Sequence, residues 1–284
     1  MIYICIPALD EAPTVGVLLW KVRQTLTEFG RDFHLIVLDD GSTDATQEVL
    51  EPYARVLPLT VLRNERTQGY AAAVERLLRE AVARSTHPKR DVAVVLQGDF
   101  TESPDDIPSL IRKIEGGADV VGTTVAAVDR EQTRTERWAR RGLPWLLSSR
   151  AIPREISDPL SGFRAYRVAV LKRALGESDG KPLLTRPGLA ANVEILLAVS
   201  PHVRRADSAE VSLRYSRRER PTRFRAWGMV KEVWDLRRHA PRRAPAPAEA
   251  APPRDAAGKA PPPEGTRPVR DPARKAPPER PKTE

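Results

Sequence analysis

VAVVLQGDFTESPDDIP, residues 92–108, is the stretch that decides the fold. It starts with five apolar residues, 92–96, and then breaks off into Gln97-Gly98-Asp99. A short apolar run that ends in turn residues is typical of a buried strand followed by a loop. Because ligands of open α/β sheets bind at the carboxyl ends of the strands, the pattern places the Asp99 carboxylate at a candidate ligand-binding edge.

Predicted strands alternate with predicted helices on both sides of this stretch, from residue 1 to about residue 125. Apolar runs indicate the strands, and apolar residues three and four positions apart indicate the helices. This order predicts an α/β fold with a doubly wound, mostly parallel sheet that carries helices on both faces. The predicted strands are 2–9, 33–38, 57–62, 92–96, 118–125, 163–167 and 209–215. The predicted helices are 15–29, 45–53, 70–83, 104–114, 168–175, 189–199 and 222–239.

Two hydroxyl residues are expected to cap helices. Thr14 precedes the helix predicted over 15–29, and a threonine side chain there accepts hydrogen bonds from the first backbone N–H groups. Ser103 precedes Pro104, and proline is favoured at the first helical position. We therefore expect Thr14 and Ser103 at the N-termini of these two helices.

The composition narrows the class of partner. A net charge of +9 and a pI near 10.0 suit an anionic partner, such as nucleic acid, an acidic membrane surface or a phosphorylated substrate. Aromatic residues make up only 5% of the chain and do not alternate with a basic groove, as binders of single-stranded nucleic acid require. We therefore expect a phosphorylated substrate and a membrane surface, and no nucleic acid.

The cysteine content and the apolar runs indicate the cellular compartment. Cys5 lies in the first predicted strand, where we expect a buried, reduced thiol, and a single cysteine allows no internal disulfide. We find no stretch that approaches the roughly 20 apolar residues of a membrane-spanning helix, and the N-terminus lacks the basic segment of a signal peptide. We expect a cytoplasmic protein that is peripheral at the cytoplasmic membrane.

The second half of the chain differs from the first. Residues 132–150 and 222–239 are basic and amphipathic and carry tryptophans, as do helices that lie on anionic lipid; alternatively, these tryptophans pack on the α/β core. Residues 241–284 hold 13 of the 27 prolines and few apolar side chains, so burial cannot offset the entropy of ordering them. We expect a catalytic domain over 1–220, an amphipathic helix over 221–240 and a disordered tail over 241–284.

Acidic side chains follow three of the predicted strands. Asp10-Glu11 follows the first, Asp39-Asp40 the second and Asp99 the fourth. Since these strand ends share one edge of a parallel sheet, the carboxylates converge, and a cation or the hydroxyls of a sugar would make the cluster tolerable. The alternative for any single acid is a solvated loop or a helix cap. No GxGxxG follows the first strand and no GxxxxGK[ST] occurs, so the dinucleotide and P-loop interpretations are excluded.

A set of segments occurs in a fixed order along the chain. These are IPALDEAPTVG (6–16), LDDGSTD (38–44), Asn64 to Ala71, QGDFTESPDD (97–106) and DPLSGFRAYR (158–167). Together they resemble the motifs of inverting family 2 glycosyltransferases with the GT-A fold, over roughly residues 2–225. The pattern is most similar to the polyprenyl-phosphate, or dolichyl-phosphate, mannosyl- or glucosyltransferase group.

This resemblance implies roles for matching positions. The nucleotide of a GDP- or UDP-hexose would contact Pro7, Ala8, Asp10, Glu11, Asp39, Asp40, Gly69, Gln97 and Gly98. Gln97-Gly98-Asp99 matches the D-x-D motif, whose last acid, Asp99, would bind Mg²⁺ or Mn²⁺. The acceptor would lie against Ser161, Gly162, Phe163 and Arg164. Arg217, Arg218 and Thr222 match a segment that closes over the diphosphate.

Three positions depart from the family pattern. Gln97 replaces the first acid of D-x-D, so the motif supplies one negative charge instead of two. Arg220 stands where the closing segment usually has glycine, although a cluster of guanidinium groups there suits a diphosphate. Asp10 replaces the more usual asparagine. A non-catalytic nucleotide-sugar-binding protein is therefore one alternative to an enzyme.

The chemistry that the resemblance implies is an inverting transfer of a hexose to polyprenyl phosphate, with Asp99, Arg217 and Arg218 stabilising the leaving diphosphate. A phosphate acceptor is already an anion and needs little help from a base. A soluble hydroxyl acceptor, the alternative, needs a carboxylate to take its proton. Asp158 and Glu194 are the candidates for this base, and each is equally well explained as a turn residue or a buried structural acid.

Overall fold

The structure, a computed structural model, describes residues 1–128 and 152–213. The chain divides into two compact units, Met1–Ala244 and Pro245–Glu284, and every described residue belongs to the first. The strands are β1 (Ile2–Ala8), β2 (Phe33–Asp39), β3 (Leu59–Arg63), β4 (Val92–Val95), β5 (Val120–Val128), β6 (Arg164–Arg167) and β7 (Ala206–Leu213). The helices are α1 (Ala12–Phe29), α2 (Thr46–Val56), α3 (Tyr70–Arg84), α4 (Ile107–Glu115), α6 (Val168–Glu177) and α7 (Ala190–Val199), with short 3-10 turns η1 (Pro104–Asp106) and η2 (Ser200–His202).

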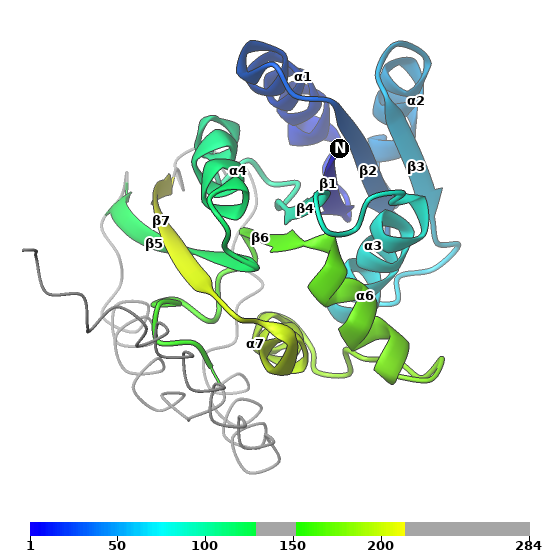
Figure 1. The fold of residues 1–284 in the computed structure, drawn as a ribbon. Helices are drawn as coiled ribbons and strands as arrows, with labels where there is room; N and C mark the ends of the chain where they lie inside the picture. Colours follow the sequence, from blue (N-terminus) through cyan, green and yellow to red (C-terminus); the bar gives the residue numbers. More distant parts are fainter. Residues whose placement is uncertain (129–151, 214–284) are drawn as a thin grey trace, which may run out of the picture. The chain divides into compact units, whose positions relative to one another are not determined.

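The seven strands form one mixed sheet in the order β3-β2-β1-β4-β6-β5-β7 (Figure 1). β1 pairs in parallel with β2 and β4, β2 with β3, and β5 with β7. β6 runs antiparallel to both of its neighbours, β4 and β5. The sheet is therefore mostly parallel, as expected, with one reversed strand in its middle.

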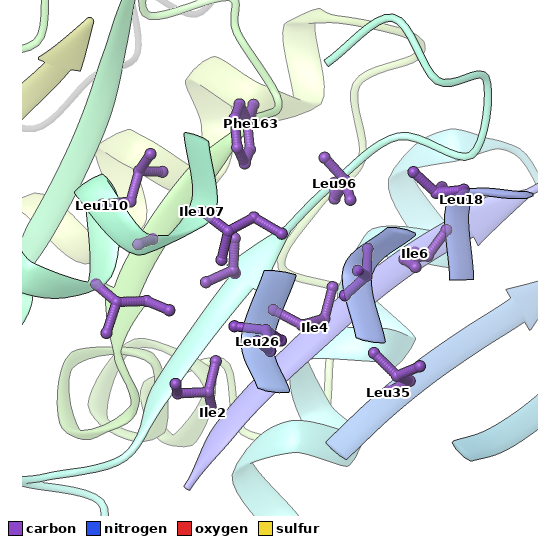
Figure 2. Packing of buried hydrophobic residues seen from close by; sticks show 14 of the residues in the cluster. Ile2, Ile4, Ile6, Leu18, Leu26, Leu35, Leu96, Ile107, Leu110 and Phe163 are labelled. Carbon is purple, nitrogen blue, oxygen red and sulfur yellow. The ribbon is translucent and has the colours of Figure 1, made fainter. Parts of the chain in front are cut away.

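Helices cover both faces of the sheet, which confirms the doubly wound arrangement. Because side chains alternate along a strand, Ile2, Ile4 and Ile6 of β1 face one layer, which includes α1, α2 and α4. Figure 2 shows these three isoleucines beside residues of α1 and α4. Tyr3 and Cys5 face the opposite layer, formed by α3, α6 and α7. Burial of each large aliphatic side chain stabilises the folded state by about 1.5–3 kcal/mol, so the apolar side chains of the two layers supply most of the hydrophobic stabilisation of this fold.

Of the two expected helix caps, Thr14 is wrong, and Ser103 occupies the N-cap position before Pro104 of η1 without the expected side-chain hydrogen bond. α1 begins at Ala12, so Thr14 lies inside its first turn, where its hydroxyl is 2.9 Å from the Gly98 carbonyl oxygen. Thr14 thus joins α1 to the loop after β4 instead of capping a helix. Ser103 is followed by the η1 turn, in which Asp106 N donates to Ser103 O, and α4 begins only at Ile107. Among the described residues, the Ser103 side chain caps no helix N–H group.

Cys5 is completely buried, as expected, and burial raises the pKa of its thiol to about 12. Across residues 1–128 and 152–213, no helix combines the length and the apolar character needed to span a membrane. The amphipathic segments 132–150 and 222–239 and the tail 241–284 lie outside the described residues, so these three predictions stay predictions.

Candidate functional site

Four loops meet at one edge of the sheet because of the strand register. Ala8 at the end of β1 lies beside Asp39 at the end of β2, and Cys5 of β1 pairs with Val95 at the end of β4. β6 runs the other way, so its first residue, Arg164, also pairs with Val95. The loops that leave β1, β2 and β4 and the loop that enters β6 therefore lie at the same edge.

The loops after β1 and β2 are joined by reciprocal hydrogen bonds. Asp10, which has a left-handed backbone with φ of 51°, donates its N–H to Ser42 Oγ at 2.8 Å. The Asp10 carboxylate in turn accepts the N–H of Thr43 at 2.7 Å. Glu11 N donates to Thr46 Oγ1 at 2.8 Å, which adds α2 to the same assembly. The structure thus brings together two of the three predicted acidic strand ends.

Asp44 accepts hydrogen bonds from the N-termini of two helices at this edge. Its two oxygens accept the backbone N–H groups of Ala12 and Thr46, the first residues of α1 and α2, at 3.1 and 3.0 Å. A negative charge at a helix N-terminus is favourable because the first N–H groups carry partial positive charge. The arrangement agrees with the helix-cap interpretation that applies to any single acid of this region.

Asp39 and Asp40 are both buried, but their contacts differ. The Asp40 carboxylate accepts four hydrogen bonds of 2.7–2.9 Å from the segment 64–69; the donors are Asn64 Nδ2, Thr67 Oγ1, Gln68 N and Gly69 N. Asp39 Oδ1 accepts one from Ser42 N at 2.9 Å. Asp39 Oδ2 lies 3.8 Å from Arg63 Nε and accepts no hydrogen bond from the part of the chain that the structure describes.

Gly41 allows the segment 64–69 to approach this closely. It has a φ of 73°, and a Cβ added to it would lie 2.7 Å from the Arg66 carbonyl carbon and 2.8 Å from Thr67 N. Real Cβ atoms do not come so near a backbone, so a side chain at this position would push the two loops apart. Gly69, the residue expected to admit the nucleotide, also has a positive φ, 93°.

The loop after β4 packs against the loop after β1. A Cβ on Gly98 would lie 3.1 Å from the Pro7 carbonyl oxygen and 3.2 Å from Glu11 Cγ, so only a small residue fits between β4 and β1 here. Asp99 is 8% exposed, and its Oδ1 accepts the N–H of Thr101 at 3.0 Å. The third predicted acid therefore joins the other two at this edge.

Glu102 is an acid of the same loop that the sequence reasoning missed. It is 5% exposed, and its Oε2 accepts the N–H of Gln97 at 2.9 Å. Its only signal in the sequence is its place three residues after Asp99. The D-x-D segment, in which Gln97 stands in place of the first acid, thus has a second buried carboxylate, that of Glu102, hydrogen-bonded to its backbone.

The carboxylate oxygens of this loop supply only some of the ligands that a hard divalent cation needs. Carboxylate oxygens of the Asp99 and Glu102 type are the ligands that Mg²⁺ and Mn²⁺ prefer. Within residues 1–128 and 152–213, however, no three histidine, cysteine, aspartate or glutamate side chains are grouped to hold a metal ion. A cation here therefore needs further oxygen ligands, such as those of a phosphorylated substrate.

The loop that enters β6 is fixed by its own hydrogen bonds and by a buried aromatic side chain. Asp158 Oδ1 accepts the N–H groups of Leu160 and Ser161, at 3.0 and 3.2 Å, which is the geometry of an aspartate turn. Phe163 is fully buried in the apolar core, close to Ile107 and Leu110 in Figure 2. Ser161 is half-buried and shares a hydrogen bond of 2.8 Å with Thr123.

Arg164 is 1% exposed and donates hydrogen bonds to the carbonyl oxygens of Pro159 and Ser161 at 3.2 and 3.0 Å. The buried Arg164 guanidinium therefore holds the backbone of the loop in place through these two carbonyl groups. The predicted direct contacts of Phe163 and Arg164 with an acceptor therefore stay predictions, and the buried positions of both side chains favour an indirect role.

Glu194 of α7 is tied to a neighbouring segment. Its Oε2 accepts the N–H groups of Thr185 and Arg186 at 2.7 and 2.9 Å, and its Oε1 accepts the Thr185 hydroxyl at 2.8 Å. Glu75 of α3 holds the residues just before them in the same way, through Leu183 N and Leu184 N. These contacts favour the structural alternative for Glu194 over the catalytic one.

The predicted phosphate-closing residues Arg217, Arg218 and Thr222, together with Arg220, lie outside the described residues. The sequence reasoning also missed two described residues at this edge, Tyr70 and Asn192. The Tyr70 hydroxyl donates to Asn192 Oδ1 at 2.9 Å. The only sequence signal for this pair was a tyrosine directly after Gly69 and an asparagine two residues before Glu194 in a mostly apolar helix.

Comparison with known proteins gives a family match. The family model described as Glycosyl transferase family 2 matches residues 3–175. An undecaprenyl-phosphate 4-deoxy-4-formamido-L-arabinose transferase of Edwardsiella ictaluri is 29% identical over 180 residues, which cover 61% of this chain and 50% of that protein. A dolichol-phosphate mannosyltransferase of Pyrococcus furiosus is 29% identical over 178 residues, 60% of this chain and 47% of that protein. The chain thus matches about half the length of these relatives.

Solved structures share the fold. Glucosyl-3-phosphoglycerate synthase of Mycobacterium tuberculosis, in complex with phosphoglyceric acid, superposes with a TM-score of 0.56 at 20% identity and covers 85% of this chain and 81% of that one. The same enzyme with Mn²⁺, UDP-glucose and phosphoglyceric acid gives a TM-score of 0.55, also at 20% identity, over 85% of this chain and 80% of that one. This likeness confirms the expected GT-A fold.

Proposed function

Because the chain belongs to glycosyl transferase family 2, we propose that it moves a hexose, with inversion, from a nucleotide diphosphate to polyprenyl phosphate. The observation that carries the proposal is the meeting of the loops after β1, β2 and β4, with their acids, at one edge of the sheet. Both relatives named above are transferases whose names specify a polyprenyl phosphate. The donor is a UDP- or GDP-hexose.

In this proposal the nucleotide lies against the loops after β1 and β2. Pro7, Ala8, Asp10 and Glu11 line one side, and Asp39 faces the base and ribose from the other. Asp39 is suited to this contact because its Oδ2 accepts no hydrogen bond from any described residue. Asp40 acts indirectly, since its carboxylate fixes the segment that ends at Gly69. Gln97 and Gly98 complete this side of the site.

The diphosphate lies beside the loop after β4. Asp99 is the residue that would hold Mg²⁺ or Mn²⁺, and the diphosphate would supply further oxygen ligands. Such a cation would neutralise charge on the leaving group. Arg217 and Arg218 are assigned to the same diphosphate, because guanidinium groups bind phosphate oxygens in pairs.

The acceptor approaches from the loop that enters β6, over Ser161 and Gly162. A phosphate oxygen of the lipid attacks the anomeric carbon, a new C–O bond forms, and the bond to the diphosphate breaks with release of the nucleoside diphosphate. The attacking oxygen is already anionic, so no base has to take a proton. Asp158 and Glu194 then serve to shape loops. Peripheral binding at the cytoplasmic membrane brings the chain to its lipid acceptor.

The test is a transfer assay with the purified full chain. Radiolabelled UDP- and GDP-hexoses are incubated with Mg²⁺ or Mn²⁺ and with vesicles that contain undecaprenyl phosphate, and the products are extracted into organic solvent. We expect label in the lipid fraction, released again by mild acid. Absence of turnover with every donor overturns the proposal, and label in a water-soluble product assigns the donor chemistry to a hydroxyl acceptor instead.

Asp158→Asn separates the two acceptor classes within one assay. An asparagine keeps the turn, because its side-chain oxygen still accepts the N–H groups of Leu160 and Ser161. It has no carboxylate to take a proton. With a phosphate acceptor, kcat changes less than about threefold; with a hydroxyl acceptor that uses Asp158 as its base, kcat falls about 10²–10⁴-fold.

A further inference from the structure

A buried polar network links the α3 helix to the loop that enters β6. The Tyr70 hydroxyl, at the start of α3, donates to Asn192 Oδ1 of α7 at 2.9 Å. Asn192 Nδ2 donates to the Leu160 carbonyl oxygen at 2.9 Å, inside the loop. Asn192 is 2% exposed, so both of its amide bonds are made away from bulk water. One asparagine therefore joins two helices to this loop.

Gly162 lies where the side chains of this network converge. A Cβ added to it would lie 2.6 Å from the Tyr70 hydroxyl oxygen, 3.3 Å from Asn192 Nδ2 and 3.5 Å from Gln97 Nε2. The three neighbours come from α3, from α7 and from the loop after β4. The position of Gly162 is thus set by residues of three separate elements, and it has no room for even a methyl group.

Arg164 supports the same loop from its other end. Its Nη1 donates to the Asn192 carbonyl oxygen at 3.0 Å and to the Tyr166 hydroxyl at 3.2 Å, and its Nη2 reaches the carbonyl oxygens of Pro159 and Ser161. The backbone of α7 and the backbone of the loop therefore share one buried guanidinium.

The network continues to the loops of the proposed nucleotide site. Tyr70 directly follows Gly69, whose N–H donates to the buried Asp40 carboxylate at 2.8 Å. Burial and the nearby Glu102 charge raise the pKa of the Tyr70 hydroxyl, so it stays protonated and remains a donor to Asn192 at physiological pH. An unbroken series of contacts thus runs from Asp40 through Tyr70 and Asn192 to Leu160.

We propose that Tyr70 and Asn192 are positioning residues that set the place of residues 158–162, and with them the acceptor, relative to the nucleotide. This inference rests on the proposed function and deepens it. Misplacing a reactant by about 1 Å can cost about 10²-fold in rate, so a single hydroxyl that fixes the loop has a measurable effect. Neither residue needs to touch the reacting atoms.

The test is Tyr70→Phe, which removes the hydroxyl and keeps the ring. Tyr3→Phe is the control, because Tyr3 is a buried tyrosine at the start of β1, at the opposite end of the strand from the candidate site, whereas Tyr70 is partly buried. We expect Tyr70→Phe to lower kcat/KM for the lipid acceptor at least tenfold, while the Kd for the nucleoside diphosphate changes less than twofold. Tyr3→Phe should change neither quantity.

Hydrogen exchange measured by mass spectrometry gives a second, activity-independent reading. Tyr70→Phe should speed exchange of the amides of residues 158–162, and Tyr3→Phe should not. Faster exchange without any turnover in the parent protein would mean that the positioning network exists and that the proposed function is wrong. Unchanged exchange, or an equal loss of donor and acceptor affinity, would overturn the positioning role itself.

Discussion

Gly69 N donates a hydrogen bond of 2.8 Å to Asp40 Oδ2, and this contact separates the roles of two adjacent carboxylates. Asp40 is saturated by the segment 64–69, whereas its neighbour Asp39 has an oxygen that accepts no hydrogen bond from the described residues. Two consecutive acids of one motif thus have different tasks. Asp40 fixes the segment 64–69, and in the proposed function Asp39 is the acid assigned to the nucleotide.

This difference predicts that the same substitution lowers the stability of the protein by different amounts at the two positions. Asp40→Asn replaces an acceptor oxygen by an NH₂ group that faces N–H and NH₂ donors, so we expect a loss of about 1–3 kcal/mol in the free energy of unfolding. Asp39→Asn keeps its bond to Ser42 N through the amide oxygen and should cost less than about 1 kcal/mol. Urea unfolding followed by circular dichroism measures both values.

Nucleotide binding by the same two variants completes the comparison. Asp39→Asn should weaken the binding of the nucleoside diphosphate about tenfold, since a charged hydrogen bond to the ligand is lost without a change in the fold. Calorimetric titration of each variant measures this affinity. Equal stability losses in the two variants would contradict the division of roles.

Gln97→Asp restores the missing charge of the D-x-D segment. The new carboxylate would lie next to Glu102, which contacts the backbone of residue 97, and close in sequence to Asp99. Without metal, three neighbouring carboxylates repel, so we expect the melting temperature to fall by a few degrees. With Mn²⁺ present, the variant should recover and bind the ion more tightly than the parent protein, without needing a nucleotide.

Thermal melts with and without about 1 mM Mn²⁺, the upper end of the dissociation constants of weak Ca²⁺ sites built from oxygen ligands, check this prediction. Gln24→Asp on α1 is the control, because it adds the same charge far along the chain from the loop after β4; since it also removes the hydrogen bond from Gln24 to Glu28, only its response to Mn²⁺ is compared. An equal Mn²⁺ response in both variants would show that added charge alone, and not the D-x-D position, causes the effect.

Cys5 offers a direct measure of unfolding, because it is the chain's single cysteine and is fully buried. The thiolate is the reactive form, and a pKa raised to about 12 by burial leaves almost none of it at pH 8. We expect a maleimide to label the native protein only as fast as the protein unfolds, and to label it at once in concentrated urea. Rapid labelling of the native state would contradict the buried position of β1.

Local patterns were sufficient to predict β1, β2 and β4. Each is a short apolar run followed by an acid or an amide, so its signal lies within the strand itself and does not depend on which strands it pairs with. The antiparallel direction of β6 was not predictable in this way, since it depends on the path of the chain between β5 and β6. Strand–helix alternation predicts only which strands exist, and not how a late strand enters the sheet.

The division of labour among the site residues also escaped the sequence. Asp40 is separated from its partners Gln68 and Gly69 by almost thirty positions, and Tyr70 from Asn192 by 122. Motif resemblance marks such residues as belonging to a site, but only the packing of distant segments shows whether a carboxylate faces outward or holds a loop. Thr14 is a similar case, because its hydroxyl points to Gly98 across the sheet edge.

The ion pair between Lys113 of α4 and Asp207 of β7 predicts a dependence of stability on pH. Lys113 Nζ lies 2.9 Å from Asp207 Oδ1, and its hydrogen bond holds the pKa of this carboxyl below the ordinary value of 3.8. A carboxyl whose pKa is lower in the folded state stabilises the fold above its unfolded pKa, and this contribution is lost as the pH falls through the folded value. Asp207→Asn should therefore lower the free energy of unfolding by about 0.5–1 kcal/mol at pH 7, and the difference from the parent protein should shrink as the pH falls below the ordinary value of 3.8. Urea unfolding at a series of pH values measures this difference, with Glu210→Gln on the exposed side of the same strand as the control. A difference that stays unchanged as the pH falls well below 3.8 would mean that the charge of Asp207 contributes nothing to the effect.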